Sequence, residues 1–219
     1  KADFGIVVDP DVDRLAFVCE DGSMFGEEYT LVAVADYVLS INKGNTVSNL
    51  SSTRALSDIT NKYGGIYFAS AVGEVNVVEK MKETKAVIGG EGNGGIIYPE
   101  LHYGRDALVG IALFLTSLAL KNSKVSKVRS SFTNYFISKN KIQLKPSHDV
   151  SMILSKIQEK YINNKINTID GVKIDFDEGW VHLRKSNTEP IIRIYTESLS
   201  KEKADSLAIT FIEEINNLI

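Results

Sequence analysis

Three aspartates, Asp9, Asp11 and Asp13, occupy alternate positions directly after a short apolar run, Phe4–Val8. Carboxylate oxygens are ligands that Mg²⁺ prefers, and the ion keeps positions open for water or a phosphate oxygen. Arg14 follows at once and can pair with a carboxylate or neutralise a phosphate. The residue types and their spacing therefore predict a divalent-metal loop, with Mg²⁺ as its ion.

Other interpretations of this acidic loop exist. An EF-hand fails, because it would need glycine at the sixth position, where Arg14 stands, and flanking helices where the pattern predicts strands. A haloacid-dehalogenase phosphatase also begins with an apolar strand and Asp-x-Asp, but its later pair of acidic residues is not apparent. The third alternative is a solvated acidic turn without function.

A glycine-rich segment, Gly89–Gly95, contains two polar side chains, Glu91 and Asn93, among five glycines. Glycine lets a backbone approach a ligand closely, and a carboxylate and an amide can hydrogen-bond sugar hydroxyls. No Gly-Lys-Ser/Thr ending follows, so the segment is not a P-loop. The composition predicts a sugar-binding loop, and an ordinary turn is the alternative.

A second polar loop, Arg184–Pro190, carries phosphate donors of several kinds. Guanidinium, hydroxyl, amide and turn N–H groups can all donate to phosphate oxygens. The candidate phosphate-binding residues are Arg184, Ser186, Asn187, Thr188 and Arg193. We expect the Arg184 guanidinium to be exposed and to point away from the core. A polar hairpin loop without a ligand is the alternative.

The elements that position these loops change character along the chain. Helices at 27–42, 53–63, 74–83 and 106–120 alternate with short apolar strands, which indicates crossover units on a mostly parallel mixed sheet. A polar, Ser/Lys-rich stretch at 121–131 indicates a domain boundary. Beyond it, strands at 135–144, 172–176, 180–184 and 191–196 and helices at 150–161 and 201–218 predict an antiparallel sheet with two helices. The fold class is thus an α/β domain followed by an α+β domain.

Composition limits the possible partners. The formal net charge is −3, so no general basic field attracts nucleic acid or an anionic membrane. One cysteine, Cys19, excludes an internal disulfide and fits a cytoplasmic location. No membrane span or signal peptide is visible. The chain begins without Met and almost at once enters an apolar strand that we expect to be buried, so we expect it to be part of a longer protein.

The three loops, taken in order, resemble those of the α-D-phosphohexomutase family, which includes phosphoglucomutase, phosphomannomutase and phosphoglucosamine mutase. The acidic loop is similar to the family's Asp-Gly-Asp-Gly-Asp-Arg, with Pro10 and Val12 in place of the glycines. The glycine-rich segment is similar to Gly-Glu-x-Ser-Gly, with Asn93 in place of serine. Arg184–Pro190 matches Arg-x-Ser-Asn/Gly-Thr-Glu-Pro throughout. The resemblance spans essentially the whole chain.

This resemblance implies an enzyme that interconverts hexose 1-phosphate and hexose 6-phosphate through a phosphoserine and a hexose bisphosphate. It implies that the three aspartates hold Mg²⁺ and that Arg14 lies near the phosphoryl group. It assigns the sugar hydroxyls to Glu91 and Asn93. It implies that the non-reacting phosphate is bound by Arg184, Ser186, Asn187, Thr188 and Arg193.

Family members have four domains, and the resemblance assigns residues 1–26 to the tail of the metal-binding second domain. It assigns 27–125 to the sugar-binding third domain and 126–219 to the phosphate-binding fourth. The phosphorylated serine belongs to the first domain, and its Ser-His-Asn-Pro setting does not occur here. We therefore expect the chain to work with domains one and two and to be inactive alone; a stand-alone phosphosugar-binding module is the alternative. The general acid and base stay unassigned.

Overall fold

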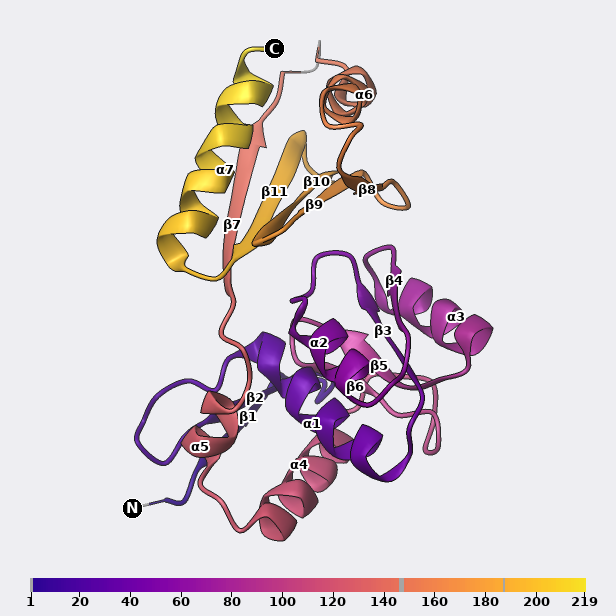
Figure 1. Ribbon diagram of the computed structural model, residues 1–219, viewed down its shortest axis with the longest axis vertical. Coiled ribbons are helices and arrows are strands. Elements are labelled where there is room, and N and C mark those ends of the chain that lie inside the picture. The colour runs from indigo at the N-terminus through magenta and orange to yellow at the C-terminus, as the bar shows by residue number, and fades with distance from the viewer. Residues whose placement is uncertain (1, 146–147, 187) are drawn as a thin grey trace. The chain divides into compact units, whose positions relative to one another are not determined.

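The structure is a computed structural model that describes residues 2–145, 148–186 and 188–219. The chain divides into two compact units, Lys1–Thr133 and Asn134–Ile219, which Figure 1 shows in indigo to rose and in orange to yellow. None of the described helices is long and apolar enough to cross a membrane.

A four-stranded sheet with the order β4-β3-β5-β6 forms the centre of the first unit. Its strands are β3 (Asn45–Asn49), β4 (Tyr67–Ser70), β5 (Ala86–Glu91) and β6 (Gly95–Ile97). Strand β3 pairs in parallel with β4 and β5, and β6 is antiparallel to β5. This confirms the predicted mostly parallel mixed sheet.

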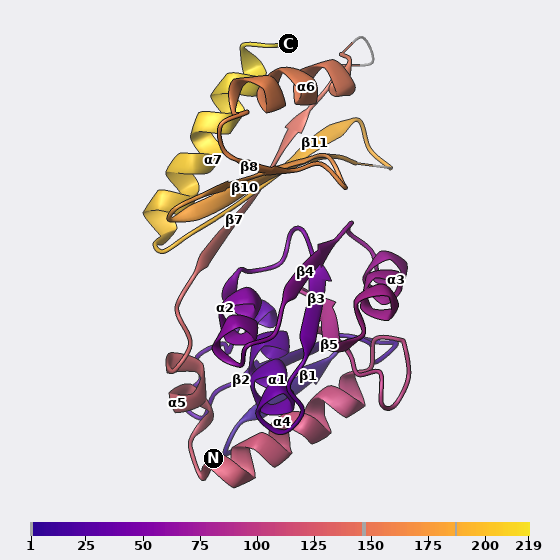
Figure 2. The ribbon, with the colours of Figure 1, turned by 45° about the vertical axis from the view of Figure 1, so that its right-hand side comes forward.

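Helices cover both faces of this sheet. They are α1 (Glu27–Ile41), α2 (Ala55–Lys62), α3 (Glu74–Thr84) and α4 (Ala107–Lys121). Figure 2 shows α3 on one side of β3 and β4, and α1 and α2 on the other. Val77 and Met81 of α3 pack on Val47 of β3 and Ile97 of β6, so burial of apolar side chains fixes the helix against the sheet.

A separate antiparallel pair, β1 (Gly5–Val8) and β2 (Leu15–Val18), flanks the acidic loop. Phe17 of β2 is fully buried and stacks on Phe114 with ring centroids 4.1 Å apart. The expectation that 4–8 is a buried strand is wrong for this chain: Ile6 and Val7 are 43% and 53% exposed. Strand β1 pairs only with β2, so its outer side chains meet no second layer among the described residues.

The stretch at 121–131, expected to be a polar boundary, contains a further helix, α5 (Val125–Ser130). Val125 is buried, and the backbone N–H of Ser126 donates to Glu20 over 3.1 Å. Arg129 lies 3.4 Å from the centre of the Tyr29 ring. These contacts hold the stretch in the first unit. The division between the two units falls after Thr133, whereas the family resemblance placed the domain boundary after residue 125.

The second unit is an antiparallel sheet with two helices, as predicted, and it has five strands where the sequence indicated four. The strand order is β7-β11-β10-β9-β8. The strands are β7 (Phe136–Gln143), β8 (Lys165–Asn167), β9 (Val172–Phe176), β10 (Gly179–Lys185) and β11 (Ile191–Ser198), and the helices are α6 (Val150–Lys160) and α7 (Lys201–Asn216). Strands β10 and β11 pair antiparallel, from Gly179 opposite Ser198 to Lys185 opposite Ile192. Alternate residues of the central strands, such as Val181 and Ile194, bury their side chains with Phe211 of α7.

Candidate functional site

The acidic loop joins β1 to β2 and brings the three predicted metal ligands together. One carboxylate oxygen from each of Asp9, Asp11 and Asp13 lies within 4.8 Å of the other two. The Asp9 side chain organises the turn, because its Oδ1 accepts from the backbone N–H groups of Asp13 at 3.2 Å and Arg14 at 3.0 Å. The sequence prediction that these carboxylates converge is geometrically satisfied.

Val12 adopts a backbone conformation that glycine reaches more easily than valine. Its φ of 58° lies in the left-handed region, which β-branched residues adopt at a cost. The turn is closed by a hydrogen bond from Val12 N to Asp9 O, 3.1 Å long. The Val12 carbonyl accepts from Ala107 N, also at 3.1 Å, which attaches the loop to the start of α4.

The carboxylates of the loop have unequal proton affinities. Loss of solvent raises the pKa of Asp9, but the N–H donors of Arg14 and Asp13 outweigh it, and the net pKa is below the usual value. Burial raises the pKa of Asp13; the nearby charge of Arg105 opposes the shift, and those of Asp11 and Asp9 add to it. Arg14 lies 3.6 Å from Asp9 and 3.7 Å from Asp13 through its Nε. The cluster therefore carries more negative charge than its own cations neutralise.

The glycine-rich segment runs from β5 to β6 and contacts the first residue of β2, directly after the acidic loop. Leu15 N, at the start of β2, donates to Gly94 O over 3.1 Å. Gly94 has a φ of +85°, and a Cβ there would lie 2.1 Å from the Leu15 carbonyl oxygen. Glycine at this position is thus required by contact with β2.

Glu91, predicted to bind sugar, is largely buried at the end of β5, with 7% of its side chain exposed. Its Oε1 accepts from Asn49 Nδ2 at 2.9 Å and Gly73 N at 3.2 Å. Its Oε2 accepts from Arg105 Nη1 at 3.1 Å. Asn93 is half-buried, and its Oδ1 accepts from Gly95 N at 3.1 Å. Both candidates line the same loop, and the backbone of that loop holds Asn93 in place.

Arg105 joins the two loops and was not found from the sequence. Its side chain is 14% exposed and contacts three carboxylates: Asp13 through Nη2, Glu91 through Nη1 and Glu74 through Nε. The Glu74 contact is 3.2 Å long, and Glu74 Oε1 also accepts from Arg105 N at 2.9 Å. An arginine just before a predicted helix has no distinctive spacing, so only the fold shows its partners.

The predicted phosphate loop links β10 to β11 in the second unit. Ser186 is buried and its Oγ accepts from the backbone N–H groups of Thr188 at 3.4 Å and Glu189 at 3.3 Å. Thr188 is exposed. Asn187 lies outside the described residues. The serine therefore shapes the loop through its hydroxyl oxygen.

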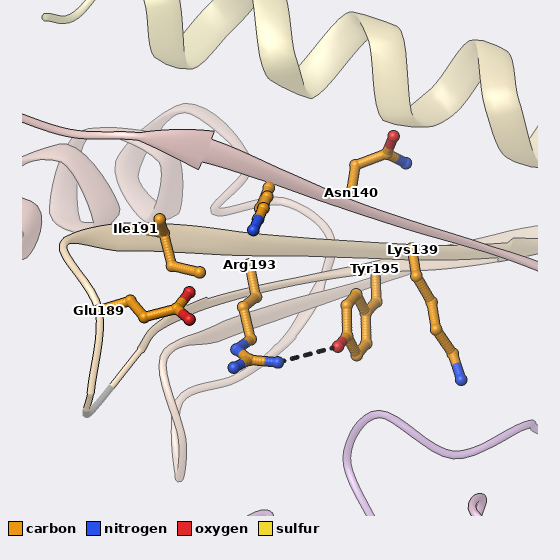
Figure 3. A pocket seen from close by; sticks show the side chains of 7 residues that line it. Lys139, Asn140, Glu189, Ile191, Arg193 and Tyr195 are labelled. Carbon is orange, nitrogen blue, oxygen red and sulfur yellow. Dashed lines mark hydrogen bonds between the residues drawn. The ribbon is translucent and has the colours of Figure 1, made fainter.

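Arg184 and Arg193 are direct cross-strand neighbours on β10 and β11, so their side chains share one face of the sheet. The expectation that Arg184 is exposed is wrong. Its side chain is 16% exposed, and its Nε lies 3.2 Å from Asp170 Oδ2. Arg193 Nη1 donates to the Tyr195 hydroxyl over 3.4 Å, as Figure 3 shows.

A pocket of about 320 Å³ adjoins Arg193 within the second unit (Figure 3). Its lining includes three cations, one carboxylate and a phenol, a set suited to an anion. The lining residues are Lys139, Asn140, Lys141, Glu189, Ile191, Arg193 and Tyr195.

Known proteins contain the same two domains in the same order along the chain. Residues 26–135 match the family model for "phosphoglucomutase/phosphomannomutase, alpha/beta/alpha domain III", and 139–214 match the model for the C-terminal domain of the same family. A phosphoglucomutase/phosphomannomutase of Thermococcus kodakarensis is 37% identical over 97% of this chain and 48% of its own length. A probable phosphoglucosamine mutase of Methanopyrus kandleri is 30% identical over 100% and 49%. The chain thus spans about half the length of the curated relatives it matches.

Solved structures of known proteins have a similar fold. A phosphoglucomutase/phosphomannomutase family protein of Burkholderia thailandensis matches 99% of this chain and 47% of its own, with a TM-score of 0.83 and 24% identity. An N-acetylphosphoglucosamine mutase of Aspergillus fumigatus, solved with GlcNAc-6P and magnesium, has a TM-score of 0.71 and 14% identity, covering 97% of this chain and 52% of its own. By its matches to two domain models of one family, and by the fold that these structures share, this chain belongs to the phosphoglucomutase/phosphomannomutase family.

Proposed function

We propose that this chain supplies the metal, sugar and phosphate loops of a phosphohexomutase, an enzyme that interconverts hexose 1-phosphate and hexose 6-phosphate through a phosphoserine and a hexose bisphosphate. Family membership and the names of the relatives support this proposal. Because the chain spans about half of those relatives, domains one and two would supply the serine. The family match gives no support to a haloacid-dehalogenase phosphatase. A cytoplasmic location stays a prediction that rests on the lone Cys19.

The donor set of the acidic loop fits Mg²⁺. Asp13 Oδ1 is buried and accepts no hydrogen bond among the described residues, with Arg14 Nε 3.7 Å away, whereas Oδ2 is bound by Arg105. A buried carboxylate oxygen without a partner is unfavourable unless a cation completes it. Asp9 and Asp11 offer further hard oxygens within 4.8 Å. When bound, Mg²⁺ would supply positive charge to the phosphate oxygens.

The side chains near the loops have donors and acceptors left for a sugar phosphate. An ionised carboxylate has about four acceptor positions, and three donors contact Glu91, so one position remains for a sugar hydroxyl. The Asn93 amide nitrogen donates to no described residue and is available to a second hydroxyl. Arg14, whose side chain is 52% exposed, is placed to contact a phosphoryl group.

Phosphate binding in the second unit is proposed for Arg184, Ser186, Thr188 and Arg193, with Asn187 included from the sequence. The Arg184 Nε lies 3.2 Å from Asp170 Oδ2 as an ion pair without a hydrogen bond among the described residues, and we take the two terminal nitrogens as the donors to phosphate. The backbone N–H groups that now point at Ser186 Oγ lie 3.3 and 3.4 Å from it. Hydrogen bonds this long are weak, so a phosphate oxygen could compete for these donors.

One observation carries the proposal: the metal loop and the sugar loop are joined directly, by Leu15 N to Gly94 O and through Arg105. A ligand that reached both loops would need an anionic oxygen for a metal and hydroxyl groups for Glu91 and Asn93. A phosphorylated sugar has both. A solvated acidic turn without function does not require contacts with a polar glycine-rich loop.

The test is an assay of a longer protein that contains this chain together with domains one and two. We expect it to convert glucose 1-phosphate or glucosamine 6-phosphate to the isomeric phosphate in the presence of Mg²⁺ and hexose bisphosphate. Asp13→Asn should abolish conversion, and the 219-residue chain alone should be inactive. Release of inorganic phosphate without isomerisation would favour a phosphatase, and ligand binding without turnover would favour a binding module.

A further inference from the structure

We propose that Arg105 is a positioning residue that orients the metal ligand Asp13 and the sugar-binding Glu91 together, so that one side chain sets the geometry of both loops. This inference rests on the proposed function, because it takes Asp13 as a ligand of Mg²⁺ and Glu91 as a ligand of the sugar.

The first step concerns the two oxygens of Asp13. Arg105 Nη2 binds Oδ2, and the buried Oδ1 accepts no hydrogen bond among the described residues; Arg14 Nε lies 3.7 Å from it, beyond hydrogen-bond distance. A guanidinium held on one oxygen fixes the rotation of the carboxylate and directs the other oxygen to the metal. Groups that hold metal ligands in this way commonly change metal affinity by about 10- to 100-fold when they are replaced.

The second step concerns Glu91. The Arg105 Nη1 atom lies 3.1 Å from Glu91 Oε2, which accepts from one donor where Oε1 accepts from two, so the position left for a sugar hydroxyl is on Oε2. Three nitrogens of one planar group thus serve three carboxylates: Asp13, Glu91 and Glu74. Lysine has a single nitrogen at the end of a flexible stem and cannot reproduce this fork.

The third step is that Arg105 is itself held rigidly. Its backbone N–H and its Nε both contact the Glu74 carboxylate, at 2.9 and 3.2 Å. Its aliphatic part packs over Gly95, where a Cβ would lie 2.5 Å from Arg105 Cδ. The next residue, Asp106, caps α4 by accepting from Val109 N at 3.0 Å. Because its backbone and its stem are both fixed, Arg105 can transmit a position from one loop to the other.

The charge of Arg105 and the geometry that it imposes have opposite effects on the affinity of the acidic loop for Mg²⁺. The positive charge of Arg105 opposes the binding of a cation near Asp13, so its removal would change the local field as well as the orientation of the carboxylate. Arg105→Lys keeps the charge and removes the fork, which isolates the geometric contribution. Arg129→Lys is the matched control, because Arg129 stacks on Tyr29 and contacts neither loop.

The experiment is a Mg²⁺ titration of the 219-residue chain, followed by amide NMR at Arg14 and at Gly92–Gly95. We expect Asp13→Asn to remove the Mg²⁺-dependent shifts and Arg105→Lys to weaken Mg²⁺ binding about tenfold. Arg105→Lys should also move the amides of Gly92 and Gly95 before any metal is added, because Glu91 loses a partner. Arg129→Lys should leave both readouts unchanged.

Arg105→Lys that binds Mg²⁺ within twofold of the unaltered chain, while Asp13→Asn does not bind, would overturn the inference and leave the proposed metal site intact. If Arg105→Lys does not fold, the same Mg²⁺ titration of Glu74→Asp tests the inference, because this variant keeps the charge and shortens the side chain that anchors Arg105. We then expect a smaller fall in Mg²⁺ affinity in the same direction. Unchanged affinity in Glu74→Asp would contradict the positioning role.

Discussion

Arg184 Nε lies 3.2 Å from Asp170 Oδ2, an ion pair that ties the end of β10 to the residues just before β9. The two side chains are only 16% and 21% exposed. An arginine that was expected to serve a ligand alone therefore also has a structural partner. The pair orients the guanidinium, and under the proposed function its terminal nitrogens bind a phosphate, so substitution should affect both ligand affinity and stability.

Arg184→Lys in the longer enzyme should raise KM about tenfold or more, because lysine keeps the charge but loses the two-pronged hydrogen bond to a phosphate. Serine phosphorylation should continue, because that serine belongs to domain one. Stability should fall by about 1 kcal/mol, because a partly buried ion pair is weakened. Steady-state kinetics and thermal melting measure the two effects. The neighbouring exposed Lys185→Ala is the control and should change neither. A lower melting temperature with unchanged KM would mean that the loop is a structural hairpin.

The 219-residue chain should bind Mg²⁺ weakly, with a dissociation constant in the millimolar range. Three carboxylates provide the protein's ligands, and we expect a phosphoserine of domain one to complete the site. Calorimetry of the chain with MgCl₂ measures this, with Asp13→Asn as the blank. Micromolar or tighter binding would show that the loop is a complete site by itself.

The three candidate loops could be predicted because each is local in sequence. Asp9, Asp11 and Asp13 converge through a single turn, and alternating spacing is enough to indicate this. Arg105 could not be predicted, because its partners Asp13, Glu74 and Glu91 lie in three other segments of the chain. Such contacts depend on how the strands are ordered, which residue spacing does not reveal.

The fold class was predicted from periodicity, and its misses have physical causes. Strand β8 is three residues long, too short to show alternation. Helix α5 is also short and contains Ser, Lys and Arg, so its two buried valines, Val125 and Val128, gave no clear apolar face. The ion pair of Arg184 with Asp170 crosses between strands and could not be read from either segment.

Val12→Gly should stabilise the first unit slightly. Val12 has a φ of 58°, a conformation that costs an L residue about 1–2 kcal/mol and glycine almost nothing. The greater freedom of glycine in the unfolded chain offsets about 0.4–1 kcal/mol of this. We expect a net gain of roughly 0.5 kcal/mol, measured by denaturant unfolding. Val12→Ala, which keeps a Cβ in the same backbone conformation, should not show the gain. A loss of stability in Val12→Gly would mean that the valine side chain contributes more by packing than its backbone costs.

The second unit should lose stability as the pH falls from about 6.5 to 4, because of His182. This residue is 1% exposed on β10, and its Nε2 donates to the Asp170 carbonyl over 2.6 Å. Burial lowers its pKa from 6.5 to about 4; the bond to Asp170 opposes the shift, and the charges of Lys173 and Arg184 add to it. In this pH window the unfolded chain binds a proton that the native state does not, so stability falls as the pH falls.

The loss reaches roughly 3 kcal/mol at pH 4 and is absent above pH 7. The only tryptophan, Trp180, lies on the same strand, so its fluorescence during urea unfolding at pH 7 and pH 4.5 reports on this unit. His182→Gln keeps an N–H donor and cannot be protonated, and carboxylates that titrate in the same range affect both proteins alike. The variant should therefore lose less stability between the two pH values than the unaltered chain does. An equal loss in both would mean that His182 is protonated in the native state or accessible to water.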